Sequence, residues 1–190
     1  MIHPLLEKRY SPRAFSEQSI SRTDMEILFE AARWSPSARN EQPWRFIFAS
    51  KENNESYQQM LHILSDWNQQ WAQSAPVLML AVAKKQFSYK NRDNEHALYD
   101  LGQAVAHLTF QASALGLYLH QMGGFSKEKA SQWLGIPSGY EPVTMIALGY
   151  KGELERIPQS YHADETKPRV RLKTDCIHFE NQWRECEHDE

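Results

Sequence analysis

Helical periodicity is the strongest pattern along the chain. In three long stretches, apolar residues recur every three or four positions, as they do on the buried face of a helix. The last stretch is apolar nearly all round in its second half, so we expect a central helix that protein covers on most sides. A shorter helical stretch lies at the beginning of the chain. The predicted helices are 2–8, 25–34, 57–71 and 97–115.

Residues that begin or end helices stand where these predictions need them. Ser21 and, three residues later, Asp24 form a capping box before the first long helix. Pro76 follows the second long helix, and Gly116 ends the third. Ser126 is placed to cap a further short helix.

Four short runs predict β-strands. The run 77–83 is continuously apolar, as in a strand that is buried on both faces. The helices and strands do not alternate regularly enough for a full doubly wound sheet. We therefore expect an α+β fold, in which a small mixed β-sheet packs against helices and one long apolar helix is central. The other predicted strands are 44–49, 118–122 and 143–148.

The last forty residues differ from the rest of the chain. Residues 151–166 are polar and show little apolar periodicity, and 170–179 alternates in a way that fits either an edge strand or an arm. This segment has too few apolar residues for a core of its own. We expect one domain over 1–190, with 151–190 as a C-terminal extension or arm that lies on its own body or on a partner subunit.

Composition and charge exclude several classes of protein. The chain has 190 residues, of which 41% are hydrophobic and 24% charged, which is typical of a globular protein. The net charge of −3 provides no basic field for binding nucleic acid. No apolar run is long enough to span a bilayer, and the first residues do not have the pattern of a signal peptide. We expect a cytoplasmic protein that binds neither nucleic acid nor membrane.

Common metal and nucleophile motifs are absent from the sequence. His96 and His107 share one face of a predicted helix, but no carboxylate stands at a spacing that would complete a metal site. Cys176 and Cys186 lack the C-x-x-C spacing, so we expect two separate thiols. No G-x-S-x-G motif occurs. We predict no metal, and no side chain that acts as nucleophile or base.

Glycine placement changes how this chain would bind a phosphate. All eight glycines lie between Gly102 and Gly152, so neither of the glycine-rich nucleotide motifs occurs. A phosphate must instead be held by cationic side chains and hydroxyls. Arg9, Ser11 and Arg13 alternate and would point to the same side of an extended segment, where two guanidiniums suit an anion. Taken alone, a solvated basic turn explains this segment at least as well.

Three later segments carry further candidate ligands. Asn40 and Gln42 are amides in a loop between two prolines, and amides can pair with both donors and acceptors of a heteroaromatic ring. The pair Gly123 and Gly124 would let a flat ligand approach the backbone closely. Residues 167–171 are cationic. Each segment also has a plain structural explanation: an ordinary loop, a tight turn and a solubilising tail.

Taken together and in order, these segments resemble the nitroreductase family of flavin enzymes. The resemblance extends over nearly the whole chain, and P-S-x-x-N-x-Q-P-W is its most specific piece. The matching motifs are R-x-S-x-R-x-F from Arg9, A-x-x-x-P-S-x-x-N-x-Q-P-W from Ala32, G-G-F from Gly123, A-L-G-Y from Ala147 and K-x-R from Lys167.

The resemblance implies a homodimer with FMN bound tightly at the subunit interface. It assigns the first loop to the phosphate and ribityl chain, with Arg13 toward the pyrimidine end of the ring. The loop at Pro36 reaches the partner's flavin, the glycine turn offers N–H groups to N5 and O4, and the late cations return to the phosphate. The residues assigned to cofactor binding are Arg9, Tyr10, Ser11, Arg13, Pro36, Ser37, Ala38, Asn40, Gln42, Asn68, Met122, Gly123, Gly124, Lys167 and Arg169.

Some of these assignments have alternatives or departures. Asn68 matches the family's asparagine in a register that could shift by one. The late cations could be Arg169 and Arg171 in place of Lys167 and Arg169. Ala38 stands where many members carry a serine, and a lysine common after the asparagine is missing.

The implied activity is that of an oxidoreductase in which the cofactor carries the chemistry. NAD(P)H would deliver hydride to flavin N5, and an electron-poor small molecule such as a nitroaromatic or quinone would then be reduced, in ping-pong order. Arg13 and the backbone of Gly123 and Gly124 would provide electrostatic support. The alternatives are a flavin-binding or redox-sensing protein with little turnover, and a specialised family reaction such as dehydrogenation or dehalogenation.

Overall fold

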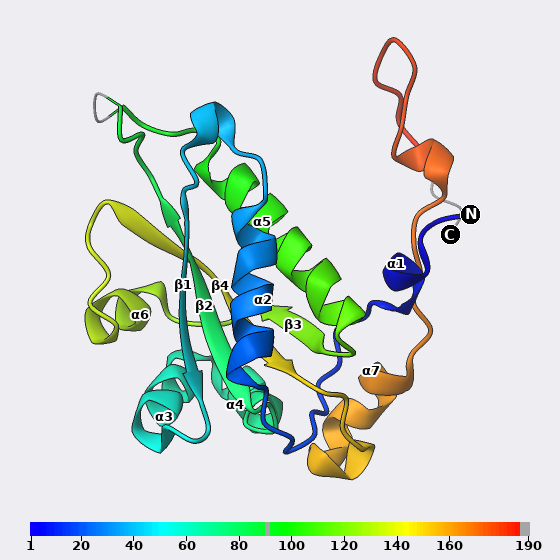
Figure 1. Cartoon of the computed structure of the whole chain (residues 1–190). Coiled ribbons are helices and arrows are strands. Elements are labelled where there is room, and N and C mark those ends of the chain that lie inside the picture. The colour runs from blue at the N-terminus through cyan, green and yellow to red at the C-terminus, as the bar shows by residue number, and fades with distance from the viewer. Residues whose placement is uncertain (90–91, 187–190) are drawn as a thin grey trace.

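The computed structural model describes residues 1–89 and 92–186 and has a four-stranded sheet with helices on both faces (Figure 1). The strand order is β1-β2-β4-β3, and each neighbouring pair is antiparallel. The α+β prediction is confirmed, but the expected mixed sheet is wrong. Strands β2 and β3 do run parallel, yet β4 lies between them, so no parallel pair is hydrogen-bonded. The strands are β1 (Trp44–Ser50), β2 (Val77–Lys84), β3 (Tyr118–Met122) and β4 (Tyr140–Gly149).

Strand β2 divides two hydrophobic cores. Leu78 and Leu80 point into a core with α3, α4 and α6, whereas Met79 and Ala81 point into a second core with α2 and α5. This is why β2 is apolar at every position: a strand covered on both faces has no polar side. The helices are α2 (Arg22–Arg33), α3 (Asn54–Ile63), α4 (Asp66–Ala72), α5 (Ala97–Ala114) and α6 (Lys127–Trp133).

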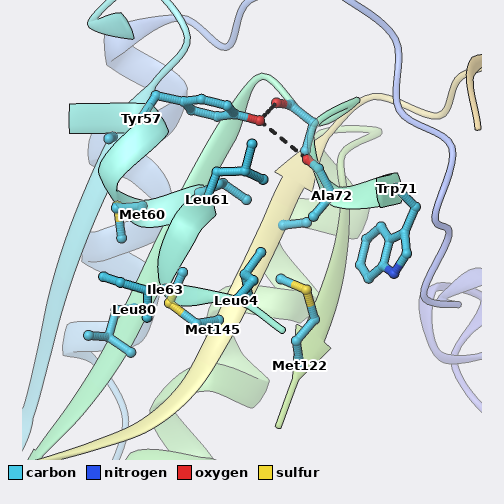
Figure 2. Close-up of a cluster of buried hydrophobic side chains, with 14 of the residues drawn as sticks. Tyr57, Met60, Leu61, Ile63, Leu64, Trp71, Ala72, Leu80, Met122 and Met145 are labelled. Carbon is cyan, nitrogen blue, oxygen red and sulfur yellow. Dashed lines mark hydrogen bonds between the residues drawn. The ribbon is translucent and has the colours of Figure 1, made fainter. Parts of the chain in front are cut away.

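The core beneath α3 and α4 contains a buried tyrosine. Figure 2 shows Tyr57 reaching from α3 toward the end of α4. Its hydroxyl donates a hydrogen bond to the Ala75 carbonyl at 2.6 Å and lies 3.3 Å from the Ala72 carbonyl. Trp71 lies at the edge of the same cluster, with 1% of its surface exposed. Burial raises the pKa of the Tyr57 hydroxyl, so this group stays neutral and serves as a donor.

The predicted helix 57–71 is two helices, so this boundary was missed. At Leu64 the backbone is extended, with φ −66° and ψ 155°, and Leu64 forms a β-bridge with Phe125. The Ser65 N–H donates to the Gly124 carbonyl at 2.9 Å. The apolar spacing of three and four continues through the break, so periodicity alone cannot reveal it. Long-range pairing with the segment after β3 interrupts the helix.

The predicted helix-end residues Ser21, Ser126 and Gly116 are confirmed. Ser21 Oγ accepts the Asp24 N–H at 3.0 Å, and Ser126 Oγ accepts the Lys129 N–H at 3.1 Å. Gly116 ends α5 with a φ of +74°, in the left-handed region that favours glycine. The short first helix is α1 (Pro4–Lys8).

The outer face of α5 is open in a single chain, contrary to the expected cover on most sides. Leu98 is 51% exposed, Tyr99 68% and Phe110 39%. The inner face packs on α2 and the sheet, through residues such as Leu101 and Leu108. Much of this apolar outer face is therefore exposed in the described chain, although Phe110 contacts His3 of α1.

The C-terminal segment contains helix α7 (His162–Thr166) and runs past α1 and away from the sheet (Figure 1). The described residues between 170 and 179 form no strand. Of the two expected structures, an edge strand and an arm, the edge strand is therefore wrong. Val170 is 80% exposed and Trp183 80%. Cys176 and Cys186, expected to be separate thiols, form a disulfide. None of the helices that the structure describes has the length and apolar character needed to cross a membrane.

Candidate functional site

The first loop, residues 9–13, meets the C-terminal segment in a cluster of guanidinium groups. Arg9 Nη1 donates to Ser11 Oγ at 3.3 Å, and Arg169 donates to the carbonyls of Glu7 and Arg9. Burial and the positive charges of Arg169 and Arg171 lower the pKa of Arg9. Within the described part of the chain, no carboxylate forms an ion pair with any of the three arginines. Uncompensated guanidiniums beside a hydroxyl can bind a phosphate group.

Arg13, in the same loop, is held by helix α7. Its backbone N–H donates to Glu165 Oε2 at 2.9 Å, and its Nη2 lies 3.6 Å from Asp164 Oδ2. Arg13 Nε and Glu165 Oε1 are both buried and have no hydrogen-bond partner among the described residues. The carboxylates of α7 thus fix the loop at Arg13, and one guanidinium N–H remains unused.

Tyr10 packs against the body of the protein. Its ring meets Tyr118 of β3 edge-on, with 5.1 Å between the ring centroids. Lys151 Nζ lies 5.7 Å from the centre of the Tyr10 ring. Burial raises the pKa of Tyr10, so its hydroxyl stays protonated. These contacts anchor the loop between Arg9 and Ser11 on the edge of the sheet.

The loop before β1 has a strained backbone. Arg39, Asn40 and Gln42 have φ values of 55°, 54° and 50°, in the left-handed region that non-glycine residues seldom adopt. The Ala38 N–H donates to Oδ2 of Asp100, a buried residue of α5, at 3.0 Å. Each such residue costs about 1–3 kcal/mol, and such conformations cluster at functional sites.

The side chains of this loop also bond to one another. Gln42 Nε2 lies 3.2 Å from the Asn40 carbonyl and 3.3 Å from Asn40 Oδ1. Ser37 Oγ accepts the Gln42 N–H at 2.9 Å. Pro36 and Asn40 are exposed. The loop is therefore held internally and presents its outer side to the surroundings.

The glycine turn follows β3, after the buried Met122. Gly123 and Gly124 are exposed, and neither N–H donates a hydrogen bond to a described residue. The Gly124 carbonyl accepts from Asn68 Nδ2 at 3.0 Å. A Cβ at Gly124 would lie 2.7 Å from that same nitrogen, so the close approach of α4 requires glycine. The turn offers two backbone donors that the chain itself does not use.

The expected site residues gather in two regions of the chain. The first loop, the arginine cluster and the glycine turn lie around β3 and α1, whereas the loop 36–42 lies over the start of α5 (Figure 1). His3, at the start of α1, contacts Phe110 of α5, with 5.4 Å between the rings. The rise of a helix puts Asp100 and Phe110 about 15 Å apart along α5. Lys167 is exposed, and no contact of its side chain with the arginine cluster is found among the described residues.

Three residues that hold the site were missed in the sequence. Asp100 lies in the first turn of α5 among buried apolar positions, which is a detectable anomaly. Glu165 has no local signal in the sequence, because its hydrogen-bond partner, the Arg13 N–H, lies 152 positions away. His120 lies in β3 with Nδ1 2.9 Å from the Pro12 carbonyl, and burial is the main cause that lowers its pKa to about 4.

Two hollows of the described part of the chain lie away from these residues. One of about 630 Å³ is lined by the disulfide-bonded part of the arm, around Phe179. Another of about 560 Å³ lies beside the start of α5, around Asn94 and Leu98. Over the described ranges, no group of three or more His, Cys, Asp or Glu side chains could hold a metal ion.

Comparisons with known proteins agree on one family. Residues 6–150 match the family model for nitroreductases. A solved structure described as an oxidoreductase containing FMN is 30% identical, with a TM-score of 0.91 over 97% of this chain and 94% of that one.

Two named relatives are also similar. A protein of Archaeoglobus fulgidus, provisionally named an NADH dehydrogenase/NAD(P)H nitroreductase, is 26% identical over 93% of this chain and 95% of its own length. The oxygen-insensitive NADPH nitroreductase of Helicobacter pylori is 34% identical over 82 residues, 43% of this chain and 38% of its own length.

Proposed function

The chain belongs to the nitroreductase family, and from this premise we propose that it is an FMN-dependent oxidoreductase. It takes a hydride from NADH or NADPH and reduces an electron-poor acceptor such as a nitroaromatic or a quinone. The observation that carries the proposal is the cluster of Arg9, Arg169 and Arg171, three guanidiniums with no carboxylate partner in the described chain. The cytoplasm, where these hydride donors are regenerated, is the proposed location.

The cluster fits the phosphate of FMN. Arg9 and Ser11 provide a forked donor and a hydroxyl, and Arg169 approaches the same loop from the C-terminal segment. Burial and then the positive charges of Arg169 and Arg171 lower the pKa of Arg9, and a bound dianion would offset that repulsion. Arg171 is the second late cation near Arg9, which supports the register Arg169 with Arg171.

The glycine turn and Arg13 fit the two edges of the flavin ring. FMN, when bound, supplies the two-electron chemistry by accepting and donating a hydride at N5. The free N–H groups of Gly123 and Gly124 would donate to N5 and O4 and hold the ring in place. The guanidinium of Arg13, whose Nε is buried without a hydrogen-bond partner, would lie toward the pyrimidine edge, where negative charge grows on reduction.

A second copy of the chain would complete the site. The loop 36–42 and the first loop lie at different ends of α5, so a flavin on the first loop would meet the loop 36–42 of a two-fold related partner. Leu98, Tyr99 and Phe110 give α5 an exposed apolar face for that contact.

The C-terminal arm belongs to the same unit. Residues 151–169 fasten to the body through Glu165 and Arg169, whereas Val170, Leu172 and Trp183 are exposed apolar side chains. We assign the chain to one domain over 1–190, whose arm over 151–190 packs on the partner subunit in the dimer. Exposed apolar side chains on an arm gain free energy only when another surface covers them.

Two features favour a second function. The guanidinium of Arg13 is 3.6 Å from the Asp164 carboxylate, which would reduce its charge toward a flavin. Ala38 also lacks the hydroxyl that many family members carry at this position. A protein that binds FMN but turns over slowly, as a sensor or store, fits these two features.

Half-reactions measured separately distinguish the two functions. The purified protein is made anaerobic and mixed with NADH or NADPH, and flavin absorbance is followed; a nitroaromatic or a quinone is then added. The proposed enzyme loses its flavin absorbance rapidly and recovers it with the acceptor, at rates that account for steady-state turnover. If bound FMN is reduced far more slowly, the result supports the second function, a protein that binds FMN but turns over slowly. A chain that takes up no FMN contradicts both.

A further inference from the structure

The two segments proposed to hold opposite parts of FMN are joined by three side chains. One segment is the first loop, at Pro12, and the other is the glycine turn, at Gly124. Between them lie His120 of β3 and Trp71 and Asn68 of α4. Each link in this series is a hydrogen bond or a ring contact, and its two ends are backbone carbonyls.

The first link fixes the loop. The Pro12 carbonyl can only accept, so His120 donates from Nδ1, at 2.9 Å. Pro12 is buried, and its neighbours Ser11 and Arg13 are the polar residues that would meet the cofactor. The bond therefore fixes how far the Ser11 and Arg13 side chains lie from β3.

The second link crosses from the strand to α4. The His120 and Trp71 rings lie 4.4 Å apart between centroids, with 39° between their planes. Trp71 is 1% exposed, so its position is fixed by the core around it. In Figure 2 the Trp71 ring points away from the Tyr57 side of this core. A shift of the His120 ring would have to move Trp71 or open a gap.

The third link reaches the glycine turn. Trp71 Nε1 donates to Asn68 Oδ1 at 3.3 Å, and Asn68 Nδ2 donates to the Gly124 carbonyl at 3.0 Å. An indole N–H can only donate and a carbonyl can only accept, so the Asn68 amide has one orientation. Asn68 Nδ2 also packs closely against Gly124, since a Cβ built there would lie 2.7 Å from it. Asn68 thus acts on the turn through Gly124.

We propose that His120 and Trp71 are positioning residues that, through Asn68, set the spacing between the first loop and the glycine turn. This inference rests on the proposed function, because the spacing matters only if one FMN spans both segments. Neither side chain needs to touch the cofactor. Loss of either link lets the phosphate end and the N5 end of the site move independently, which weakens FMN binding and slows its reduction.

The variants remove one donor at a time. His120→Phe keeps a ring against Trp71 but loses the bond to Pro12, and Trp71→Phe loses the indole N–H. His120→Gln keeps an N–H donor in place of the ring. The matched control is Tyr57→Phe, which also deletes one buried donor to a backbone carbonyl, at 2.6 Å, in the same core but away from both segments.

The readouts are the Kd of FMN, by fluorescence titration of the stripped full-length protein, and the rate of flavin reduction at saturating FMN. One lost hydrogen bond predicts a Kd raised about 3- to 10-fold in His120→Phe and Trp71→Phe. The rate should fall as well, and His120→Gln, which keeps a donor for Pro12 but loses the ring contact with Trp71, should recover only part of both losses. The double variant should lose less than the product of the two single effects, because the residues act in one series.

One result would overturn the inference alone, and a different result would overturn the proposed function. If His120→Phe and Trp71→Phe lower the melting temperature as Tyr57→Phe does but leave the Kd and the reduction rate at wild-type values, the series is only core packing. If the wild-type protein binds no FMN, the proposed function itself is lost. Should His120→Phe fail to fold, Trp71→Phe and His120→Gln decide the matter by the same two readouts.

Discussion

His120 should make the free energy of unfolding fall as the pH drops from about 6.5 to 4. Burial, assisted by the nearby Arg13 charge, lowers its pKa from 6.5 to about 4, although its bond to Pro12 opposes the shift. Within this window the unfolded chain takes up a proton that the folded chain does not. Each unit of pKa difference corresponds to about 1.4 kcal/mol, so the imidazole accounts for a loss of about 3 kcal/mol by pH 4. Well above pH 6.5 the imidazole is neutral in both the folded and the unfolded state, so it does not change the free energy of unfolding with pH.

Urea unfolding at several pH values between 7.5 and 4 measures this loss. Carboxylates also titrate in this range, so the informative quantity is the difference between wild type and His120→Gln. That difference should shift by about 3 kcal/mol in favour of the variant at the acid end. His62→Gln is the matched control, because His62 is exposed on α3, and it should keep the wild-type slope. An equally steep slope in His120→Gln would refute the reasoning.

Three further substitutions test the site. Arg169→Ala should raise the Kd of FMN about 10- to 100-fold, because it removes a charge-assisted contact, and the effect should shrink at high salt in a fluorescence titration. Asp100→Ala leaves the Ala38 N–H without its buried acceptor, so the free energy of unfolding by denaturant should fall by about 2 kcal/mol. Gly124→Ala should lower the melting temperature, because its Cβ would meet the Asn68 nitrogen at 2.7 Å; Gly123→Ala, whose Cβ meets nothing within 4 Å, should not.

Elements with local signals could be predicted from the sequence. Ser21, Ser126 and Gly116 mark helix ends through bonds and backbone angles that involve only their near neighbours, and each is confirmed. The break at Leu64 could not be predicted, because its cause is a bridge to Phe125, 61 positions later. The antiparallel sheet has the same kind of cause, since the insertion of β4 between β2 and β3 leaves no trace in either strand.

In the candidate site, too, residues with local sequence signals could be predicted and long-range contacts could not. The spacing of Arg9, Ser11 and Arg13 is visible in the sequence, and in the structure Arg9 bonds to Ser11 and meets a late arginine. The tie between Arg13 and Glu165 spans 152 positions and has no local signature. His120 lies in a strand whose alternation predicts only which face it takes, not that its ring meets Trp71.

Native mass spectrometry of the purified protein tests the central claim most directly, because it reports subunits and cofactor in one particle. The proposed site, built from two chains, predicts a dimer that carries two FMN molecules and loses both when it is dissociated into subunits. Arg169→Ala should give the same dimer with less FMN. A monomer that retains FMN, or a dimer that takes up none when FMN is supplied in excess, would contradict the account.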